Sequence, residues 1–210
     1  MQKKGLFITF EGTDGCGKTT QLNMAAEFLK SKGYEVVITR EPGALETGKK
    51  IRQILLHSEE KLSDYCEMFL FLADRAQHVE ALIKPAVEQG KIVLCDRHKD
   101  SHIAYQGYGR EKNAQLIKEL NQIAVNGIEP DLTLLYCVSP EVAMKRLSGA
   151  PDRIEAEGTK FQERVLEGYK KIAKENPERI KVINADNSVE TVYNDTKNTI
   201  IELIEKKFEV

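Results

Sequence analysis

The sequence predicts an α/β protein in which a five-stranded parallel sheet lies between two layers of helices, a three-layer α/β/α sandwich. Three observations support this fold class. Short apolar runs alternate with amphipathic segments along the whole chain. The runs are continuously apolar, as in strands buried on both faces. The first run ends in a glycine-rich turn that leads into a helix. These features together predict parallel pairing with helical crossovers.

The length and composition fit one domain spanning 1–210, although two smaller domains are also compatible with 210 residues. A net charge of −2 argues against a nucleic-acid partner. The cysteines Cys16, Cys66, Cys95 and Cys137 are far apart and form no C-x-x-C pair, which predicts reduced thiols, a cytoplasmic location and no structural zinc. No apolar run reaches the roughly 18 residues of a membrane span, so no membrane partner is expected. The short apolar run near the N-terminus does not resemble a secretory signal.

The strands are predicted from apolar runs with turn residues at their ends. The first ends at Gly12, the third at Asp96-Arg97, and the others are similarly bounded. In chain order, the predicted strands are 5–10, 35–40, 91–95, 131–138 and 180–184.

The helices are predicted from apolar residues at a spacing of three and four. Leu22, Ala25, Ala26 and Leu29 follow this spacing in the first helix, which ends at Gly33. The remaining predicted helices are 48–57, 64–89, 111–126, 140–147, 159–175 and 188–207.

The helix 64–89 carries signals at both ends and one in its interior. Asp64 and Glu67 resemble a capping box, and Gly90 is a stop signal. Pro85 lies inside the segment, so we expect a bend there or a division into two helices.

The turn after the first strand reads FEGTDGCGKTT and contains the pattern Gly-x-x-x-x-Gly-Lys-Thr at Gly12, Gly17, Lys18 and Thr19. The glycines let successive backbone N–H groups point inward, and the following helix adds its positive N-terminal end. Lys18 is then expected to reach the β- and γ-phosphates of ATP, and Thr19 to bind Mg²⁺ through its hydroxyl. The predicted ATP-binding residues are Gly12, Thr13, Asp14, Gly15, Cys16, Gly17, Lys18, Thr19 and Thr20.

Asp14 is an acidic residue inside a loop that attracts anions. It therefore needs a cation or a donor, which an arginine from another segment, a substrate hydroxyl or Mg²⁺ could supply. The alternative is a solvated aspartate at the tip of the loop.

Asp96 and Arg97 follow the third strand, at the sheet edge where ligands bind in open parallel sheets. We expect them beside the phosphate loop, because the first and third strands of such folds are usually neighbours. Arg97 suits bidentate binding of a phosphate. Asp96 suits a Mg²⁺ site with Thr19, directly or through water, or orientation of an arginine.

Three further residues have both a functional and a structural interpretation. Phe71 and Arg75 are four residues apart on one helix face, where a ring and a guanidinium can bind a flat base; otherwise Phe71 is core and Arg75 a surface charge. Arg52 faces away from the apolar side of its helix and is expected in solvent, unless the preceding loop folds over the cleft.

The polar segment 146–158 is predicted to act as a lid, with Arg146 and Arg153 at its two sides. A lid arginine can stabilise the charge of a transferring phosphoryl group. The alternative is an ordinary charged loop.

Over about 6–204 the chain resembles the thymidylate kinases, in particular their bacterial form. The resemblance is carried by FEGTDGCGKTTQ (10–21), TREPG (39–43), FLADRAQHV (71–79), the CDR, DS and AYQG groups of 95–107, PDLTLL (130–135) and DRIEAEG (152–158), with a following GY at 168–169.

The resemblance implies a P-loop nucleoside monophosphate kinase fold, Mg²⁺ as cofactor, ATP and dTMP as substrates, and a homodimer. Phe71 would stack on thymine, Arg75 would bind its O4, and Arg52 and Arg97 would hold the dTMP phosphate. Tyr105 would lie under the sugar. The implied catalytic residues are Lys18, Arg97, Arg153 and Asp14; the implied acceptor-binding residues are Arg52, Phe71, Arg75, Arg97, Ser101, His102, Tyr105 and Gln106.

The family has forms with a catalytic arginine in the phosphate loop and forms with it in the lid. Gly15 occupies the loop position, which assigns the role to Arg153 or Arg146.

Several positions depart from the family pattern on the acceptor side. His98 replaces a usual tyrosine, His102 a serine near the base edge, and Lys99 an apolar residue. Ala44, Leu45 and Glu46 replace the usual loop sequence after Gly43. These departures leave two alternatives open: a kinase for another pyrimidine deoxynucleotide, or a nucleotide-binding regulatory homologue with little kinase activity. A DNA-linked ATPase is the weakest hypothesis, because no basic stripe is present.

Overall fold

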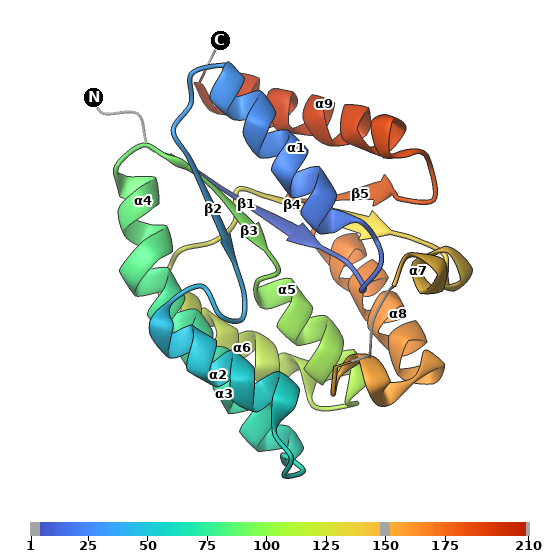
Figure 1. Ribbon diagram of the computed structural model, residues 1–210. Coiled ribbons are helices and arrows are strands. Elements are labelled where there is room, and N and C mark those ends of the chain that lie inside the picture. Colours follow the sequence, from blue (N-terminus) through green and yellow to red (C-terminus); the bar gives the residue numbers. More distant parts are fainter. Residues whose placement is uncertain (1–4, 148–151, 209–210) are drawn as a thin grey trace.

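The computed structural model describes residues 5–147 and 152–208, and it contains one parallel sheet with helices on both faces (Figure 1). The strand order is β2-β3-β1-β4-β5, and every pairing is parallel. The three-layer sandwich expected from the sequence is therefore confirmed. The strands are β1 (Leu6–Glu11), β2 (Val36–Arg40), β3 (Ile92–Asp96), β4 (Leu132–Cys137) and β5 (Ile180–Asn184).

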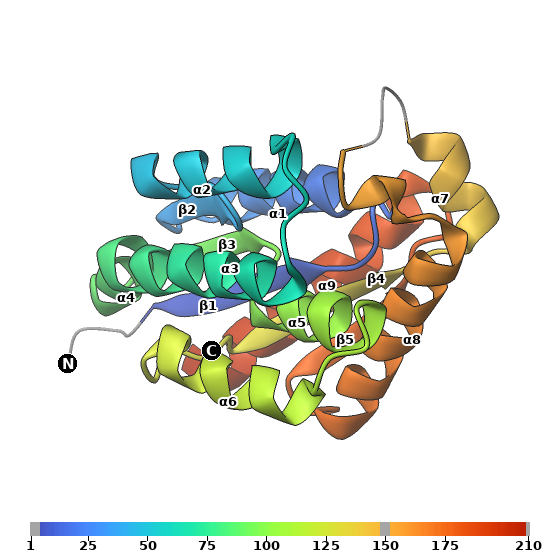
Figure 2. The same ribbon diagram turned by 90° about the horizontal axis from the view of Figure 1, so that it is seen from below.

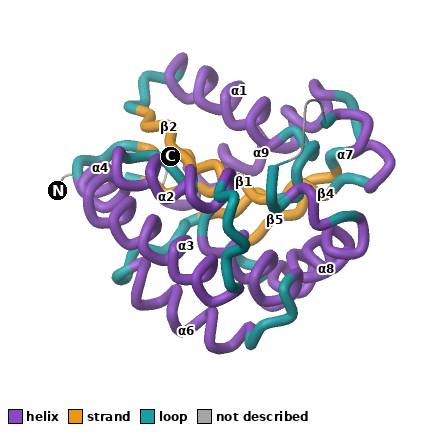
Figure 3. The backbone as a smooth tube through the Cα atoms, turned by 60° about the horizontal axis from the view of Figure 1, so that its bottom comes forward, coloured by secondary structure: helices purple, strands orange, loops and turns teal. Residues whose placement is uncertain are grey.

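Helices cover both faces of this sheet, as the tube view shows (Figure 3). No helix in the described ranges combines the length and the apolarity needed to cross a membrane. The helices are α1 (Lys18–Ser31), α2 (Glu46–His57), α3 (Asp64–His78), α4 (Lys84–Glu88), α5 (Lys99–His102), α6 (Ala114–Val125), α7 (Pro140–Arg146), α8 (Thr159–Glu175) and α9 (Val189–Phe208).

The segment 64–89 is divided, as Pro85 suggested. A π-helical turn, Val79–Ile83, joins α3 to α4, and Pro85 lies in the first turn of α4, where its missing N–H is tolerated. At the start of α3, Ser63 rather than Asp64 is the N-cap: its side chain accepts the backbone N–H of Cys66.

The sequence did not predict the helix between Lys99 and Gly109. It begins as α5 and continues as a π-helical segment, Ile103–Gly109. Nearly all of it is buried, including its polar side chains, so it shows no amphipathic period that could have indicated a helix. The next helix also begins later than expected, at Ala114, because the Asn113 side chain caps it by accepting the N–H of Leu116 at 3.1 Å.

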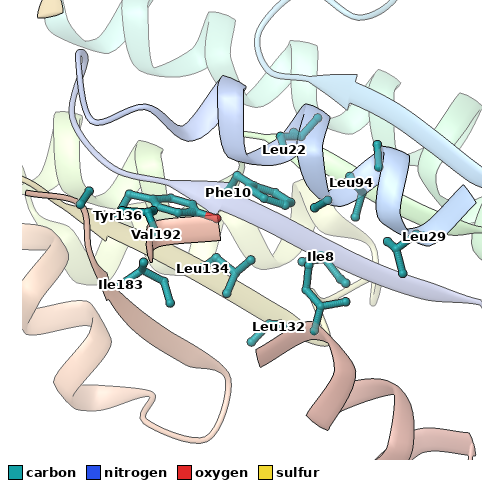
Figure 4. Close-up of a cluster of buried hydrophobic side chains, with 14 of the residues drawn as sticks. Ile8, Phe10, Leu22, Leu29, Leu94, Leu132, Leu134, Tyr136, Ile183 and Val192 are labelled. Carbon is teal, nitrogen blue, oxygen red and sulfur yellow. The ribbon is translucent and has the colours of Figure 1, made fainter. Parts of the chain in front are cut away.

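Side chains alternate across β1, so the two faces of the sheet bury different clusters of the core. Ile8 and Phe10 pack with residues of α1 and α9 in a cluster that also includes Leu134 and Tyr136 (Figure 4). Phe7 packs in a different cluster, with α4 and its π-turn. Glu11 ends the strand on the same face as Phe7.

The parallel register brings the functional segments together at one sheet edge. Phe10 pairs with Asp96, and the backbone N–H of Arg97 donates to the carbonyl of Phe10 at 3.0 Å. The expectation that the first and third strands are neighbours is thus confirmed. At the same edge, α2 lies alongside α3, and α7 lies near the start of α8 (Figure 2).

Candidate active site

The phosphate loop joins β1 to α1 and takes the backbone form that its glycines allow. Gly12, Gly15 and Gly17 have φ values of 143°, 78° and 87°, a region that other residues rarely adopt. Gly17 is the N-cap of α1, and Lys18 is its first residue. The unpaired N–H groups of a 14-residue helix therefore face the loop and favour an anion there.

Gly15 has no space for a side chain. A Cβ at this position would lie 2.5 Å from the carbonyl oxygen of Ala143, in the backbone of α7. An arginine at this loop position is therefore sterically excluded here.

Asp14 forms a salt bridge with Arg97, which comes from another segment of the chain. Its Oδ1 lies 2.7 Å from Arg97 Nη2 and 3.6 Å from Lys18 Nζ. Although burial opposes ionisation, Arg97 and Lys18 hold the pKa of this carboxyl well below its usual range. Among the partners left open by the sequence, an arginine is the one observed, and the solvated alternative is wrong.

Arg97 lies at the centre of the site with a left-handed backbone, φ 69°. Its guanidinium also covers the ring of Tyr105 at 5.0 Å. Burial alone would lower its pKa, but Asp14 and the neighbouring tyrosines raise that pKa well above normal, so the charge is permanent. Nη1 donates to Gly12 O (2.9 Å), Ser101 Oγ (3.2 Å) and Tyr169 OH (3.3 Å), and Nη2 to Asp14 Oδ1 (2.7 Å) and Tyr105 OH (3.1 Å).

Thr19 and Asp96 form the pair predicted to bind Mg²⁺. The Thr19 hydroxyl donates to Asp96 Oδ2 at 2.7 Å, across the gap between α1 and the end of β3. A hydroxyl and a carboxylate are oxygen ligands of the kind that Mg²⁺ prefers, and they lie beside the phosphate loop. The donor set therefore fits this ion.

A cavity of about 190 Å³ brings most of the predicted residues together. It extends from the phosphate loop to the segment that ends at Pro42 and to α3. Residues predicted to bind ATP and residues predicted to bind the acceptor thus line the same cavity. Those that line it are Asp14, Lys18, Thr19, Arg52, Phe71, Arg75, Asp96, Arg97, Ser101, His102, Tyr105 and Gln106.

Arg75 is not a surface charge; only 2% of its side chain is exposed. Its Nε and Nη2 bind Glu41 Oε2, both at 2.8 Å, and its Nη1 binds Asn121 Oδ1 at 2.6 Å. Although burial opposes ionisation, Arg75 keeps the pKa of Glu41 well below its usual range. Arg75 is thus a buried cation at the cavity wall, held in place from behind.

His102 lines the cavity next to Arg75. Asn121 Nδ2 lies 3.1 Å from His102 Nδ1, and Arg75 Nη1 lies 3.3 Å away. Burial and the charge of Arg75 lower the pKa of His102 to about 3, so the ring is neutral. The half-buried Phe71 ring lies 5.9 Å from it, which places Phe71 at the cavity wall as well as against the core.

Arg52 is half-buried rather than solvated, because the loop before α2 folds over it. Its Nη1 donates to the carbonyl of Pro42 at 3.1 Å, and its side chain contacts Gly43. Burial, together with Arg40, lowers its pKa. The sequence predicted Arg52 in solvent unless the preceding loop folded over the cleft. The loop does so, and Arg52 lines the cavity.

The departures from the family pattern have different environments. His98 is fully buried, edge-on to Phe7 at 5.0 Å, and burial lowers its pKa to about 3. Lys99 pairs with Glu129. Glu41 and Pro42 line the cavity, whereas Ala44, Leu45 and Glu46 are absent from the lining and lead into α2. The 44–46 substitutions therefore lie away from the acceptor space.

The lid arginines are in separate places, and residues 148–151 of the predicted lid lie outside the described ranges. Arg153 Nη2 binds Glu67 Oε2 at 2.5 Å and its Nε binds the carbonyl of Leu55 at 2.7 Å, on the acceptor side. Arg146 is exposed and binds the carbonyl of Ala185 at 3.0 Å. Neither residue lines the cavity that contains Lys18. The structure therefore does not bring them to the phosphate loop.

Sequence reasoning missed several buried residues that hold the site. Glu67 accepts hydrogen bonds from Arg153, Arg110 and Gln106. Tyr169 accepts one from Arg97 and donates one to Glu11. A carboxylate at the end of an apolar strand, or inside the apolar face of a helix, is the signal that could have found Glu11 and Glu67, because buried acids are normally paired.

A phosphate loop after β1, with an arginine-lined acceptor cavity at the same sheet edge, defines an ATP-dependent P-loop kinase of the nucleoside monophosphate class. The thymidylate kinase family model matches residues 10–196. Thymidylate kinases from an Exiguobacterium species and from Maridesulfovibrio salexigens are 46% and 45% identical, covering 96% and 97% of this chain and 97% and 98% of theirs. The crystal structure of thymidylate kinase from Ehrlichia chaffeensis superimposes with a TM-score of 0.76 at 36% identity, over 96% of this chain and 99% of that one. The chain belongs to the thymidylate kinase family.

Proposed function

We propose that the protein transfers the γ-phosphoryl group of ATP to dTMP, giving dTDP and ADP for dTTP synthesis. The observation that carries this proposal is the shared cavity, which is lined both by Lys18 of the phosphate loop and by Phe71 and Arg75 of the acceptor side. A site of this kind aligns two nucleotides and supplies positive charge where phosphoryl charge develops.

The residues divide the work by position. The N–H groups of the phosphate loop and Lys18 bind the ATP phosphates, and Mg²⁺ at Thr19 and Asp96 neutralises phosphate charge when bound. Arg97 and Arg52 hold the acceptor phosphate. Phe71 stacks on the base, and Arg75 donates to its O4. Tyr105 lies under the sugar, with Ser101, His102 and Gln106 completing the acceptor pocket.

Asp14 orients Arg97 and approaches the acceptor. Arg153 and Arg146 belong to the lid, and catalysis by either requires release from the partners seen here. The salt bridge between Arg153 and the buried Glu67 links Arg153 to the acceptor half.

A homodimer in the cytoplasm completes the proposal. Exposed apolar side chains on α2 and α3, at Ile54, Tyr65 and Phe69, offer a surface for a second copy. The four cysteines are free, as in a reducing compartment. Light scattering should give twice the monomer mass; a monomer at micromolar concentration would contradict the dimer.

The decisive test is ADP formation from ATP and Mg²⁺ with dTMP, dUMP, dCMP, dGMP, dAMP or UMP supplied singly. Strong turnover with dTMP and weak turnover with the others is expected. Because His102 adjoins Arg75, preference for another pyrimidine is the second candidate, and repeating the panel with His102→Ser identifies whether this side chain reads the base. Protein that binds ATP but turns over none of the six would overturn the kinase proposal.

A further inference from the structure

Glu11 is a fully buried carboxylate at the end of β1, directly before the phosphate loop. Its side chain lies on the face of the sheet opposite α1, toward α5 and α8. Neither the phosphate-loop motif nor the acceptor pocket uses it. Burying a carboxylate costs free energy unless the group accepts hydrogen bonds from donors, so a buried acid outside both nucleotide sites needs a physical explanation.

Glu11 receives three hydrogen bonds, all from groups next to Arg97. Oε1 accepts the backbone N–H of His98 at 2.7 Å. Oε2 accepts the Ser101 hydroxyl at 2.5 Å and the Tyr169 hydroxyl at 3.0 Å. The same two hydroxyl oxygens lie 3.2 Å and 3.3 Å from Arg97 Nη1.

The direction of the hydroxyl protons follows from these contacts. A hydroxyl has one proton, and a carboxylate can only accept. The Ser101 hydroxyl therefore donates a hydrogen bond to Glu11, and the Tyr169 hydroxyl donates to Glu11 or to Ser101, whose Oγ lies 2.7 Å away. In both arrangements the lone pairs of the two hydroxyls are directed to the guanidinium of Arg97.

The backbone of Arg97 needs this support. A φ of 69° is unfavourable for a residue with a side chain and persists only when the surroundings hold it. The backbone N–H of the next residue, His98, donates to Glu11. The carboxylate thus holds Arg97 both at its backbone and at its guanidinium.

We propose that Glu11 is a positioning residue that orients Arg97, through the hydroxyls of Ser101 and Tyr169 and the N–H of His98, for binding the acceptor's phosphate. This inference rests on the proposed function, in which Arg97 holds that phosphate.

The charges around Glu11 give the arrangement a pH dependence. Burial and the nearby Asp100 raise the pKa of Glu11 to about 7, opposed by Ser101, Arg97 and the His98 N–H. Asp100 itself is paired with Arg179, at 2.7 Å. The ionised carboxylate is the form that directs both hydroxyls to Arg97, so acceptor turnover rises as the pH rises through about 7.

Glu11→Gln tests the inference with almost no change of shape. The amide NH₂ must face either the His98 N–H, donor against donor, or the two hydroxyls, whose protons then turn toward Arg97. We expect kcat/KM for dTMP to fall about tenfold to a hundredfold, the effect of losing a hydrogen bond to a charged group. The KM for ATP should not change, and the rise in activity near pH 7 should disappear.

The matched control is Tyr136→Phe, which removes a buried hydroxyl bonded to Thr196 at 2.9 Å, away from Arg97. This variant should keep wild-type kinetics. Combining Glu11→Gln with Tyr169→Phe should cost less than the sum of the single effects, because both act on the same arginine.

If Glu11→Gln does not fold, Ser101→Ala with Tyr169→Phe removes the same link and should give the same loss. An active wild type whose Glu11→Gln variant, or this double variant, keeps full turnover and the same pH profile overturns the inference alone. A wild type without turnover on any monophosphate overturns the proposed function, and the inference with it.

Discussion

The donor half of the active site, which binds ATP, and the acceptor half, which binds the monophosphate, differ in the groups that form them. The phosphate loop is mostly backbone: three glycines at positive φ and the first turn of α1. The acceptor side is mostly buried side chains, in which Arg75, Glu41, Asn121 and His102 hold one another. A backbone site depends on local sequence, whereas a side-chain site depends on partners far apart in the chain. Substitutions on the donor side should therefore lower activity with little effect on stability, whereas substitutions on the acceptor side should lower both.

The largest effect should come from Arg75→Met on the acceptor side. It leaves Glu41 buried without its main cation, so the free energy of unfolding should fall by about 3–5 kcal/mol. Urea denaturation measures the loss. The control is Lys118→Met, which breaks an exposed pair with Glu175 and should cost less than about 1 kcal/mol. Equal losses in the two variants would show that the acceptor network contributes little to stability.

Lys18→Met should produce the opposite pattern on the donor side. Turnover should fall about 10²- to 10³-fold, because one preorganised charge at the phosphates is lost. The free energy of unfolding should change by less than about 1 kcal/mol, since Asp14 keeps Arg97 as its partner at 2.7 Å. ADP release and urea denaturation on the same samples test this separation. Lys30→Met, an exposed substitution on the same helix, should leave both unchanged.

A smaller effect, on the pH dependence of stability, should appear at Asp74, which binds the loop that folds over Arg52. This carboxyl accepts the N–H of Gly43 at 3.2 Å, and burial together with Glu41 raises its pKa to about 6. The folded state therefore keeps a proton that the unfolded state loses near pH 4. The contribution of Asp74 to the stability of the wild type should therefore fall as the pH rises from 4 to 7, whereas His98 and His102, whose pKa values are lowered to about 3, contribute in the opposite direction.

Asp74→Asn preserves the acceptor oxygen but does not ionise, so it should lack this decline. Relative to the wild type, it should gain about 2 kcal/mol over that pH interval. Denaturation curves at pH 4.5 and pH 7.5 give the comparison, and a constant difference between the two proteins would contradict the raised pKa.

The same contrast explains what the sequence could predict. The sheet and the phosphate loop follow local rules, namely apolar runs and glycines at fixed spacing, and both were predicted. The helix from Lys99 to Gly109 was missed because tertiary burial, not periodicity, stabilises it. Arg75 was ambiguous because its partner Glu41 is 34 residues away. Likewise, no local pattern indicated that Glu67 would bind Arg153 of the predicted lid.

The close approach of Gly15 to the carbonyl of Ala143 also limits how this chain can evolve. A single codon change at position 15 would introduce a side chain into space already filled by the main chain of α7. A lineage that gained a loop arginine would first have to shift α7, by a deletion or a change in the connection after β4. We therefore expect relatives with a side chain at this position to differ in α7 as well, so that the two positions change together rather than one at a time.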